Sequence, residues 1–300
     1  MNKLSLFLFT SLLFGYSFAQ DNSGLLAEDA ELQEITQDFK FTEGPIADPF
    51  GNVYFTDQPN NRILKWNALT NEVSTYLEPS GRANGLFFDK QGNLYACADE
   101  KFELWKIAPS KEITILESNY KDQKFNGPND LWIDNKGGIY FTDPYYQRPY
   151  WKRQTGEIDG QHLYYRTPNG ELLKVEDSFV QPNGLIGTFD GKKLYVADIG
   201  DKKTYRFTIN ADGSLSNKTL FTEMGSDGMT IDNKGNIYLT NENGVTVFNS
   251  NGKEILNIPI PKNWTANVTF GGKYNRTLFI TAMDAVYTLK MNVNGGNSVE

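Results

Sequence analysis

The sequence predicts an all-β protein, a six-bladed β-propeller with four strands per blade. A segment of strand, turn and strand recurs six times along the 300 residues. The starts of these copies are separated by 41, 45, 54, 44 and 40 residues, which is the spacing of four-stranded propeller blades rather than of a helical repeat. Two further apolar segments follow most copies, so each repeat supplies four strands.

The first two strands of each repeat share one register. Every copy opens on a polar residue and reaches a turn residue eight positions later. The opening residues are Glu43, Asn84, Asn129, Asn183, Asp227 and Asn267, and the turn residues are Gly51, Gly92, Gly137, Gly191, Gly235 and Asn275. Gly and Asn tolerate the left-handed backbone of a tight hairpin turn. The second strands, such as VYFTD and IYFTD, are β-branched and aromatic, as strands prefer.

The outer strands explain how the ring closes. Pairs such as RILKWN and EVSTYLE supply the third and fourth strands of a repeat. The sixth copy ends after VYTLKM with only three strands, and the segment LQEITQDF, residues 32–39, precedes the first copy. We expect this N-terminal strand to complete the last blade, because that closure removes an open sheet edge. Residues 20–300 are therefore predicted to form a single domain.

The third repeat carries an insertion, residues 145–162, between its second and third strands. A loop of this length that contains Tyr, Trp and Arg is a candidate wall or lid for a site. Its last residue, His162, is the only histidine of the chain. Whether His162 and the insertion belong to the site stays open at the level of sequence.

The N-terminus has the pattern of a secretory signal peptide. Lys3 precedes an apolar run, and the small residues Ser17 and Ala19 follow it, so residues 1–19 are predicted to be removed after Ala19. The apolar run is shorter than the roughly 20 residues that a membrane-spanning helix needs. We expect a periplasmic or secreted product that is not held in the membrane. Cys97 is the only cysteine, and its apolar strand context indicates a buried residue.

The charge of the chain excludes one class of partner. The net charge is −8 and the pI is about 4.9, whereas a nucleic-acid site needs a clustered excess of Lys and Arg. The sequence holds no such cluster. We therefore expect no nucleic-acid partner.

The six opening residues indicate a cation site. The first strand of each propeller blade lines the central axis, so carboxylates and amides converge there, and buried polar groups cost free energy unless something satisfies them. Carboxylate and amide oxygens are hard donors that suit one divalent cation, with Ca²⁺ favoured over Zn²⁺, Mg²⁺ or Mn²⁺. The alternative is that Asn-Gly and Asp-Gly pairs merely form turns that cap strands.

Four separated motifs carry a family resemblance. EGP at Glu43, PND at Asn129, PNG at Asn183 and SDG at Asp227 resemble the SMP-30/gluconolactonase family of six-bladed propellers. The resemblance implies that these four residues hold the metal. It also implies that Arg82 and Asn84, in GRANG, contact substrate oxygens together with Asn129.

The resemblance further implies an enzyme, a monomeric lactonase that hydrolyses a small sugar (aldono) lactone to its aldonic acid, with Asp227 as general base. Two alternatives stay open because a scaffold does not fix an activity. One is another ester or phosphotriester hydrolase, and the other is a non-catalytic secreted sugar-binding propeller with a structural ion. Asp130 replaces the Gly found at positions 44, 85, 184 and 228 of other copies and is expected either to orient Asn129 or to cap its own strand.

Overall fold

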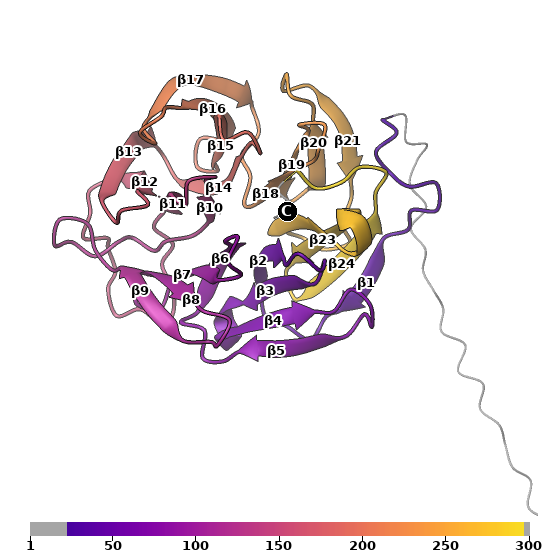
Figure 1. Ribbon diagram of the computed structural model, residues 1–300, viewed down its shortest axis with the longest axis horizontal. Coiled ribbons are helices and arrows are strands. Elements are labelled where there is room, and N and C mark those ends of the chain that lie inside the picture. The colour runs from indigo at the N-terminus through magenta and orange to yellow at the C-terminus, as the bar shows by residue number, and fades with distance from the viewer. Residues whose placement is uncertain (1–22, 297–300) are drawn as a thin grey trace, which may run out of the picture.

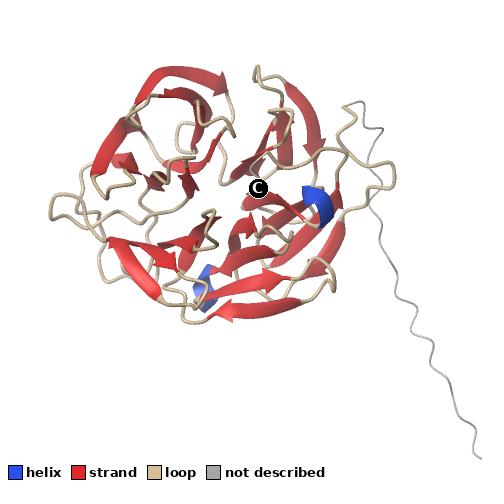
Figure 2. Ribbon diagram, viewed as in Figure 1, coloured by secondary structure: helices blue, strands red, loops and turns tan. Residues whose placement is uncertain are grey.

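The computed structural model describes residues 23–296, which form a ring of six four-stranded antiparallel sheets around a central axis (Figure 1). This arrangement confirms the predicted six-bladed propeller. The predicted signal peptide, residues 1–19, lies outside the described residues. Strands dominate the described chain (Figure 2), and its only helices are the short 3₁₀ turns η1 (Gln58–Asn60) and η2 (Lys273–Asn275).

The strands follow one another outward in each of the first three blades. The first blade consists of β2 (Thr42–Ala47), β3 (Val53–Asp57), β4 (Arg62–Trp66) and β5 (Val73–Leu77). The second consists of β6 (Ala83–Phe88), β7 (Leu94–Ala98), β8 (Glu103–Ile107) and β9 (Ile113–Glu117). The third consists of β10 (Leu131–Ile133), β11 (Ile139–Asp143), β12 (Gln161–Arg166) and β13 (Leu172–Phe179).

The same order continues in the remaining blades. The fourth consists of β14 (Pro182–Gly187), β15 (Lys193–Asp198), β16 (Lys203–Ile209) and β17 (Leu215–Thr222). The fifth consists of β18 (Met229–Ile231), β19 (Ile237–Asn241), β20 (Gly244–Phe248) and β21 (Glu254–Ile258). The sixth consists of β22 (Asn267–Gly271), β23 (Thr277–Ala282), β24 (Ala285–Lys290) and β1 (Gln33–Thr36).

The ring closes as the sequence predicts. β1, which lies ahead of the first blade in sequence, pairs antiparallel with β24, and Gln33 stands opposite Thr288. The last blade is thus completed by the N-terminal strand, and the outer edge of β24 is covered. The closure ties the two ends of the described chain into one sheet.

The predicted turns have the backbone that their residues allow. All six turn residues have positive φ, which L-residues with bulky side chains rarely adopt. The φ values are 84° at Gly51, 79° at Gly92, 87° at Gly137, 66° at Gly191, 79° at Gly235 and 54° at Asn275. The eight-residue register of the sequence therefore marks the hairpin between the first two strands of every blade.

Apolar side chains fill the space between neighbouring blades. The largest cluster includes Phe141 and Tyr164 of the third blade and Leu194 of the fourth, all fully buried. Cys97 is also fully buried in this cluster, and burial raises the pKa of its thiol well above the usual range. This confirms Cys97 as a core residue and leaves its thiol protonated at neutral pH.

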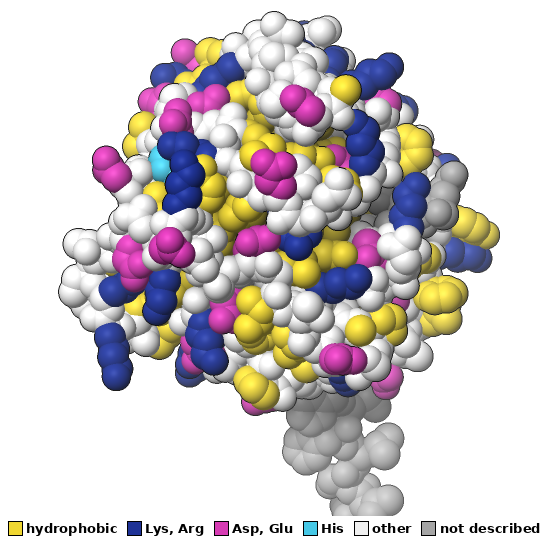
Figure 3. Space-filling model, turned by 60° about the vertical axis from the view of Figure 1, so that its left-hand side comes forward, with side chains coloured by type: hydrophobic (Ala, Val, Ile, Leu, Met, Phe, Trp, Pro, Cys, Tyr) yellow, Lys and Arg dark blue, Asp and Glu magenta, His cyan; other side chains and the backbone are white. Residues whose placement is uncertain are grey.

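The surface agrees with the charge of the sequence. On the face drawn in Figure 3, Lys and Arg side chains lie interspersed with Asp and Glu rather than gathered in a patch of one sign. Within residues 23–296, no helix is long and apolar enough to cross a lipid bilayer.

Candidate metal centre and substrate cavity

A cavity of about 340 Å³ lies where the opening residues of the blades converge. Its lining combines predicted residues with others that the repeat did not single out. The lining residues are Phe41, Glu43, Asn84, Asn129, Tyr146, Arg148, Gln181, Ile199, Asp227 and Trp264. Four of the predicted site residues therefore face one space, and Asn183 joins them through a direct contact with Asp227.

Buried threonines of the second strands fix these opening residues. Thr56 Oγ1 on β3 donates to the backbone oxygen of Asn84 in the next blade at 3.1 Å. Thr142 Oγ1 on β11 donates to the backbone oxygen of Asn183 at 2.8 Å. Each threonine is fully buried, so its hydroxyl requires a partner and holds the neighbouring blade in place. The threonine of the YFTD motif thus positions the opening residue of the following blade.

Asn183 presents an oxygen without a partner. Its Nδ2 donates to Asp227 Oδ1 at 2.8 Å and to the Tyr146 hydroxyl at 2.9 Å. With both donor hydrogens used in this way, Asn183 Oδ1 is buried and accepts no hydrogen bond within residues 23–296. A buried carbonyl oxygen without a partner costs free energy. The arrangement leaves this oxygen available to a cation.

The two carboxylates of the cavity have strongly raised pKa values. Burial and the nearby charge of Asp227 raise the pKa of Glu43 well above its usual range. Burial raises the pKa of Asp227 to about 6, although hydrogen bonds from Trp264 and Asn183 oppose the rise. Trp264 Nε1 donates to Asp227 Oδ2 at 2.6 Å. Without a counter-charge both groups keep their protons to a higher pH than usual, and a bound cation would oppose this shift.

The donor set fits a hard divalent cation. Residues 23–296 contain no group of three or more His, Cys, Asp or Glu side chains able to hold a metal. The candidate ligands are instead the carboxylates of Glu43 and Asp227 and the amide oxygens of Asn129 and Asn183. Oxygen donors of this kind suit Ca²⁺, and two carboxylates balance its charge.

The structure separates the two predicted substrate contacts of the second blade. Asn84 lines the cavity, but Arg82 is not among the described residues that do so. Arg82 Nη1 instead donates to the backbone oxygen of Pro59 at 2.7 Å, and its Nε lies 3.6 Å from Glu100 Oε1. Its guanidinium also lies 4.3 Å from the centroid of the Tyr150 ring. The side chain is held against the outside of the cavity wall.

Another arginine faces the cavity. Arg148 lies in the irregular segment between β11 and β12, and Tyr146 of the same segment also lines the cavity, so this insertion forms part of the cavity wall. Trp264 reaches the cavity from the loop before β22. The repeat could not identify these three residues, because they lie outside its shared positions. Trp151 is buried and donates from Nε1 to the backbone oxygen of Asp99, so it packs within the wall.

The sequence left the roles of His162 and Asp130 open, and the structure places both residues outside the lining of this cavity. His162 lies on β12 outside the cavity lining, and its Nε2 is 2.8 Å from the backbone oxygen of Asp159. Burial lowers its pKa. Asp130 Oδ1 accepts from the backbone nitrogen of Leu131 at 2.9 Å, so Asp130 caps its own strand. Asp130 and Asn267 line a separate cavity of about 290 Å³ along the axis, and Asn267 Nδ2 also lies 3.4 Å from Glu43 Oε2.

Comparison with known proteins identifies the family. The profile of the SMP-30/Gluconolactonase/LRE-like region matches residues 41–284, which contain the first five blades and two strands of the sixth. The chain belongs to this family. A gluconolactonase of Zymomonas mobilis is 28% identical over 312 residues, covering 93% of this chain and 86% of the relative. The diisopropyl-fluorophosphatase of Loligo vulgaris is 24% identical over 292 residues, covering 87% and 92%.

A solved gluconolactonase structure shares the architecture. A gluconolactonase of Xanthomonas campestris superposes with a TM-score of 0.83 at 27% identity, covering 89% of this chain and 91% of that chain. The likeness extends over nearly the whole described propeller. The names of the relatives above refer to two different reactions, lactone opening and fluorophosphate hydrolysis.

Proposed function

We propose that the protein is a divalent-cation-dependent hydrolase that opens a sugar lactone to its aldonic acid. Relatives named gluconolactonase support an enzyme of this class. The observation that carries the proposal is the buried, unpartnered Asn183 Oδ1 beside the carboxylate of Asp227. Glu43, Asn129, Asn183 and Asp227 would hold the cation, with Ca²⁺ as the favoured ion.

A bound cation would accept the lactone carbonyl oxygen and stabilise the negative charge that develops on it. Asp227 is the carboxylate that we assign as general base. Its two oxygens are oriented by Asn183 Nδ2 and Trp264 Nε1, and it faces the cavity. In this role Asp227 takes a proton from the water that attacks the carbonyl carbon, and the proton then passes to the ring oxygen as its bond to that carbon breaks.

The cavity also contains groups that would hold a hydroxylated ring. Asn84 and Asn129 line it, and neither side chain makes a hydrogen bond within the described chain that would compete with substrate. Gln181 and Arg148 contribute further polar atoms on the side of the third and fourth blades. Trp264 and Tyr146 add aromatic surface, on which sugars commonly pack. We also propose export to the periplasm or beyond, on the basis of the N-terminal pattern alone.

The experiment is a substrate panel with purified mature protein. Acid release from sugar lactones is followed with added Ca²⁺, Mg²⁺, Mn²⁺ or Zn²⁺ and after treatment with a chelator, beside a fluorophosphate triester. We expect cation-dependent opening of at least one sugar lactone, with a higher kcat/KM than for the triester. Faster hydrolysis of the triester would favour the phosphotriesterase alternative. Sugar binding without turnover of any substrate would favour the binding propeller.

A further inference from the structure

Arg148 presents two free donor groups to the cavity. Its Nε donates to Asp99 Oδ2 at 3.0 Å, and its guanidinium carbon lies 5.4 Å from the centroid of the Tyr146 ring. Within residues 23–296 neither terminal nitrogen of Arg148 makes a hydrogen bond, although the residue lines the cavity. A guanidinium that is anchored through Nε and open at both terminal nitrogens matches a pair of oxygen atoms.

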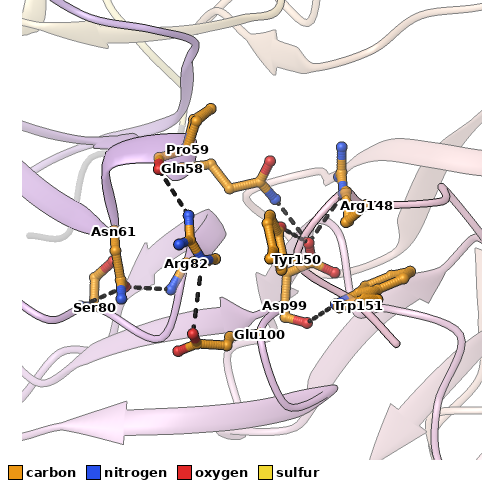
Figure 4. A network of polar contacts seen from close by, with 10 residues as sticks. All are labelled: Gln58, Pro59, Asn61, Ser80, Arg82, Asp99, Glu100, Arg148, Tyr150 and Trp151. Carbon is orange, nitrogen blue, oxygen red and sulfur yellow. Dashed lines mark hydrogen bonds and ion pairs between the residues drawn. The ribbon is translucent and has the colours of Figure 1, made fainter. Parts of the chain in front are cut away.

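Asp99 is built to hold this arginine. The Asp99 side chain is 3% exposed, and its Oδ2 accepts from Gln58 Nε2 at 3.0 Å, from Arg148 Nε and from the Tyr150 hydroxyl (Figure 4). Burial raises the pKa of Asp99, whereas the charge of Arg148 lowers it. The first two blades and the insertion thus meet at one carboxylate.

The insertion that carries Arg148 is itself fixed. Tyr150 lies between Asp99, to which it donates, and the guanidinium of Arg82, which covers its ring at 4.3 Å (Figure 4). Further along, the guanidinium of Arg153 lies 3.5 Å from the ring centroid of Phe102 and 4.5 Å from that of Trp151. These contacts hold the wall against the second blade, so Arg148 is presented in one orientation before substrate arrives.

The charges around the cavity indicate which oxygen pair Arg148 receives. Glu43 and Asp227 line the cavity beside Arg148, and buried Asp130 lies close enough to act on the charge of both carboxylates. Acidic side chains therefore outnumber Arg148 at this place. A substrate carboxylate would add an uncompensated charge to a confined space, which is costly, whereas neighbouring hydroxyls would satisfy the two terminal nitrogens without one.

We propose that Arg148 selects the substrate by binding two neighbouring hydroxyl groups of a neutral sugar lactone, and that Asp99 is the positioning residue for Arg148. This inference rests on the proposed lactone hydrolysis and adds the residue that distinguishes a sugar lactone from a lactone without hydroxyl groups. Arg148 thereby takes the role that the family resemblance implies for Arg82, and Arg82 supports it through Tyr150.

The test compares three lactones on wild type and Arg148→Met. Glucono-δ-lactone is neutral and hydroxylated, δ-valerolactone has the same ring without hydroxyls, and glucarolactone adds a carboxylate. Wild type is expected to favour the neutral hydroxylated lactone over both others. In Arg148→Met, the ratio of kcat/KM for glucono-δ-lactone to that for δ-valerolactone falls about 10- to 100-fold, mainly through KM. An unchanged ratio, or a preference of wild type for glucarolactone, overturns the proposal.

A matched variant controls for the loss of an arginine. Arg166 also donates from Nε to a carboxylate, Glu117 Oε1 at 2.7 Å, and lies away from the cavity lining. Arg166→Met is expected to keep the ratio of the two kcat/KM values. If it lowers the ratio as Arg148→Met does, the effect reports general destabilisation and the proposal falls.

The role of Asp99 is tested through its dependence on Arg148. Asp99→Asn keeps the shape of the side chain, and Tyr150→Phe removes one donor to Asp99 while keeping the ring under Arg82. Each is expected to raise KM for glucono-δ-lactone less than Arg148→Met does. In the double variant Asp99→Asn/Arg148→Met, KM is expected to equal that of Arg148→Met alone. Independent, additive effects would assign Asp99 a purely structural role.

A binding measurement distinguishes the proposed Arg148 subsite from the proposed lactone hydrolysis. Calorimetry with gluconolactam, a stable lactam analogue of the hydroxylated ring, measures the contact of Arg148 without turnover. If wild type opens no lactone, the proposed hydrolysis fails, and about 10-fold weaker lactam binding by Arg148→Met still supports the Arg148 subsite. Equal lactam binding by wild type and Arg148→Met overturns the subsite whether or not lactones are opened.

Discussion

Asn183 Nδ2 donates a 2.8 Å hydrogen bond to Asp227 Oδ1, and the same amide leaves its own Oδ1 buried without a partner among residues 23–296. The Nδ2 group of Asn183 thus holds the Asp227 carboxylate, while Asn183 Oδ1 stays available to a cation. The carboxylate of Glu43 interacts with that of Asp227, so two acidic groups meet at the same place. This division of roles within one side chain supports the proposed cation site at the axis.

The first prediction concerns Asn183. Asn183→Leu removes the unpartnered oxygen at similar volume. Ca²⁺ at about 100 times its Kd is expected to stabilise wild type by about 2.7 kcal/mol, and the variant is expected to keep less than half of that gain. Thermal unfolding with and without Ca²⁺ measures it. Asn251→Leu, at an exposed position, is the control, and a full Ca²⁺ gain in Asn183→Leu would remove Asn183 from the ligand set.

The second prediction concerns pH. Burial raises the pKa of Asp227 from 3.8 to about 6, so between these values the metal-free folded chain binds a proton that the unfolded chain has lost. The contribution of this group to metal-free stability therefore falls as pH rises through the window. The cation needs the ionised form, so its stabilising effect is expected to grow as pH rises through about 6. Unfolding temperatures with and without Ca²⁺ at about pH 5 and 7.5 measure this, and equal Ca²⁺ increments would contradict it.

The third prediction concerns Asp227 as general base. Asp227→Asn keeps the side-chain shape but cannot accept the proton from water. We expect kcat/KM for the preferred lactone to fall by about 10²- to 10⁴-fold while the propeller stays folded. The variant is expected to lose some stability, because Asn has one acceptor oxygen for the two donors Asn183 Nδ2 and Trp264 Nε1. Initial rates and thermal unfolding provide the two readouts. Asp201→Asn, at a half-buried ion-pair partner of Lys203, should keep the wild-type rate, and a fully active Asp227→Asn would refute this role.

The fourth prediction concerns the threonine that links two blades. Thr142→Val is nearly isosteric and removes the hydroxyl that donates to the Asn183 backbone oxygen at 2.8 Å. The buried carbonyl then loses this partner, so we expect a loss of about 1 to 3 kcal/mol in the free energy of unfolding. We also expect weaker Ca²⁺ binding, because Asn183 is less firmly held. Chemical denaturation and calcium titration measure both, and an unchanged calcium affinity would limit Thr142 to a role in stability.

Most of the fold could be predicted because the same local sequence pattern recurs in every blade. The opening polar residue, the turn residue eight positions later and the aromatic second strand recur, and all six turn residues have the positive φ that their types permit. The closing strand could be predicted from the missing fourth strand of the last copy, and it pairs with β24. These features are local in sequence, so a single chain displays them.

The sequence predicted which segment forms the wall of the cavity, but not how the residues of that segment are arranged. The long interval in the third repeat marks the insertion, but the path of the insertion depends on contacts with other blades, such as Asp99 with Arg148 and Tyr150. Arg82 and Arg148 are both arginines near candidate residues, and no local pattern shows that the first faces Pro59 and the second the cavity. Asp130 likewise could be assigned to its strand only once its bond to Leu131 was seen.

The most direct test of the cation site is a crystal structure of the mature protein grown with Mn²⁺ and measured for anomalous scattering. We predict one strong anomalous peak in the axial cavity, in contact with Glu43, Asn129, Asn183 and Asp227, and its loss in the Asn183→Leu crystal. A cavity without an anomalous peak, in crystals of a protein whose lactone opening Mn²⁺ supports, would contradict the assignment of these four ligands.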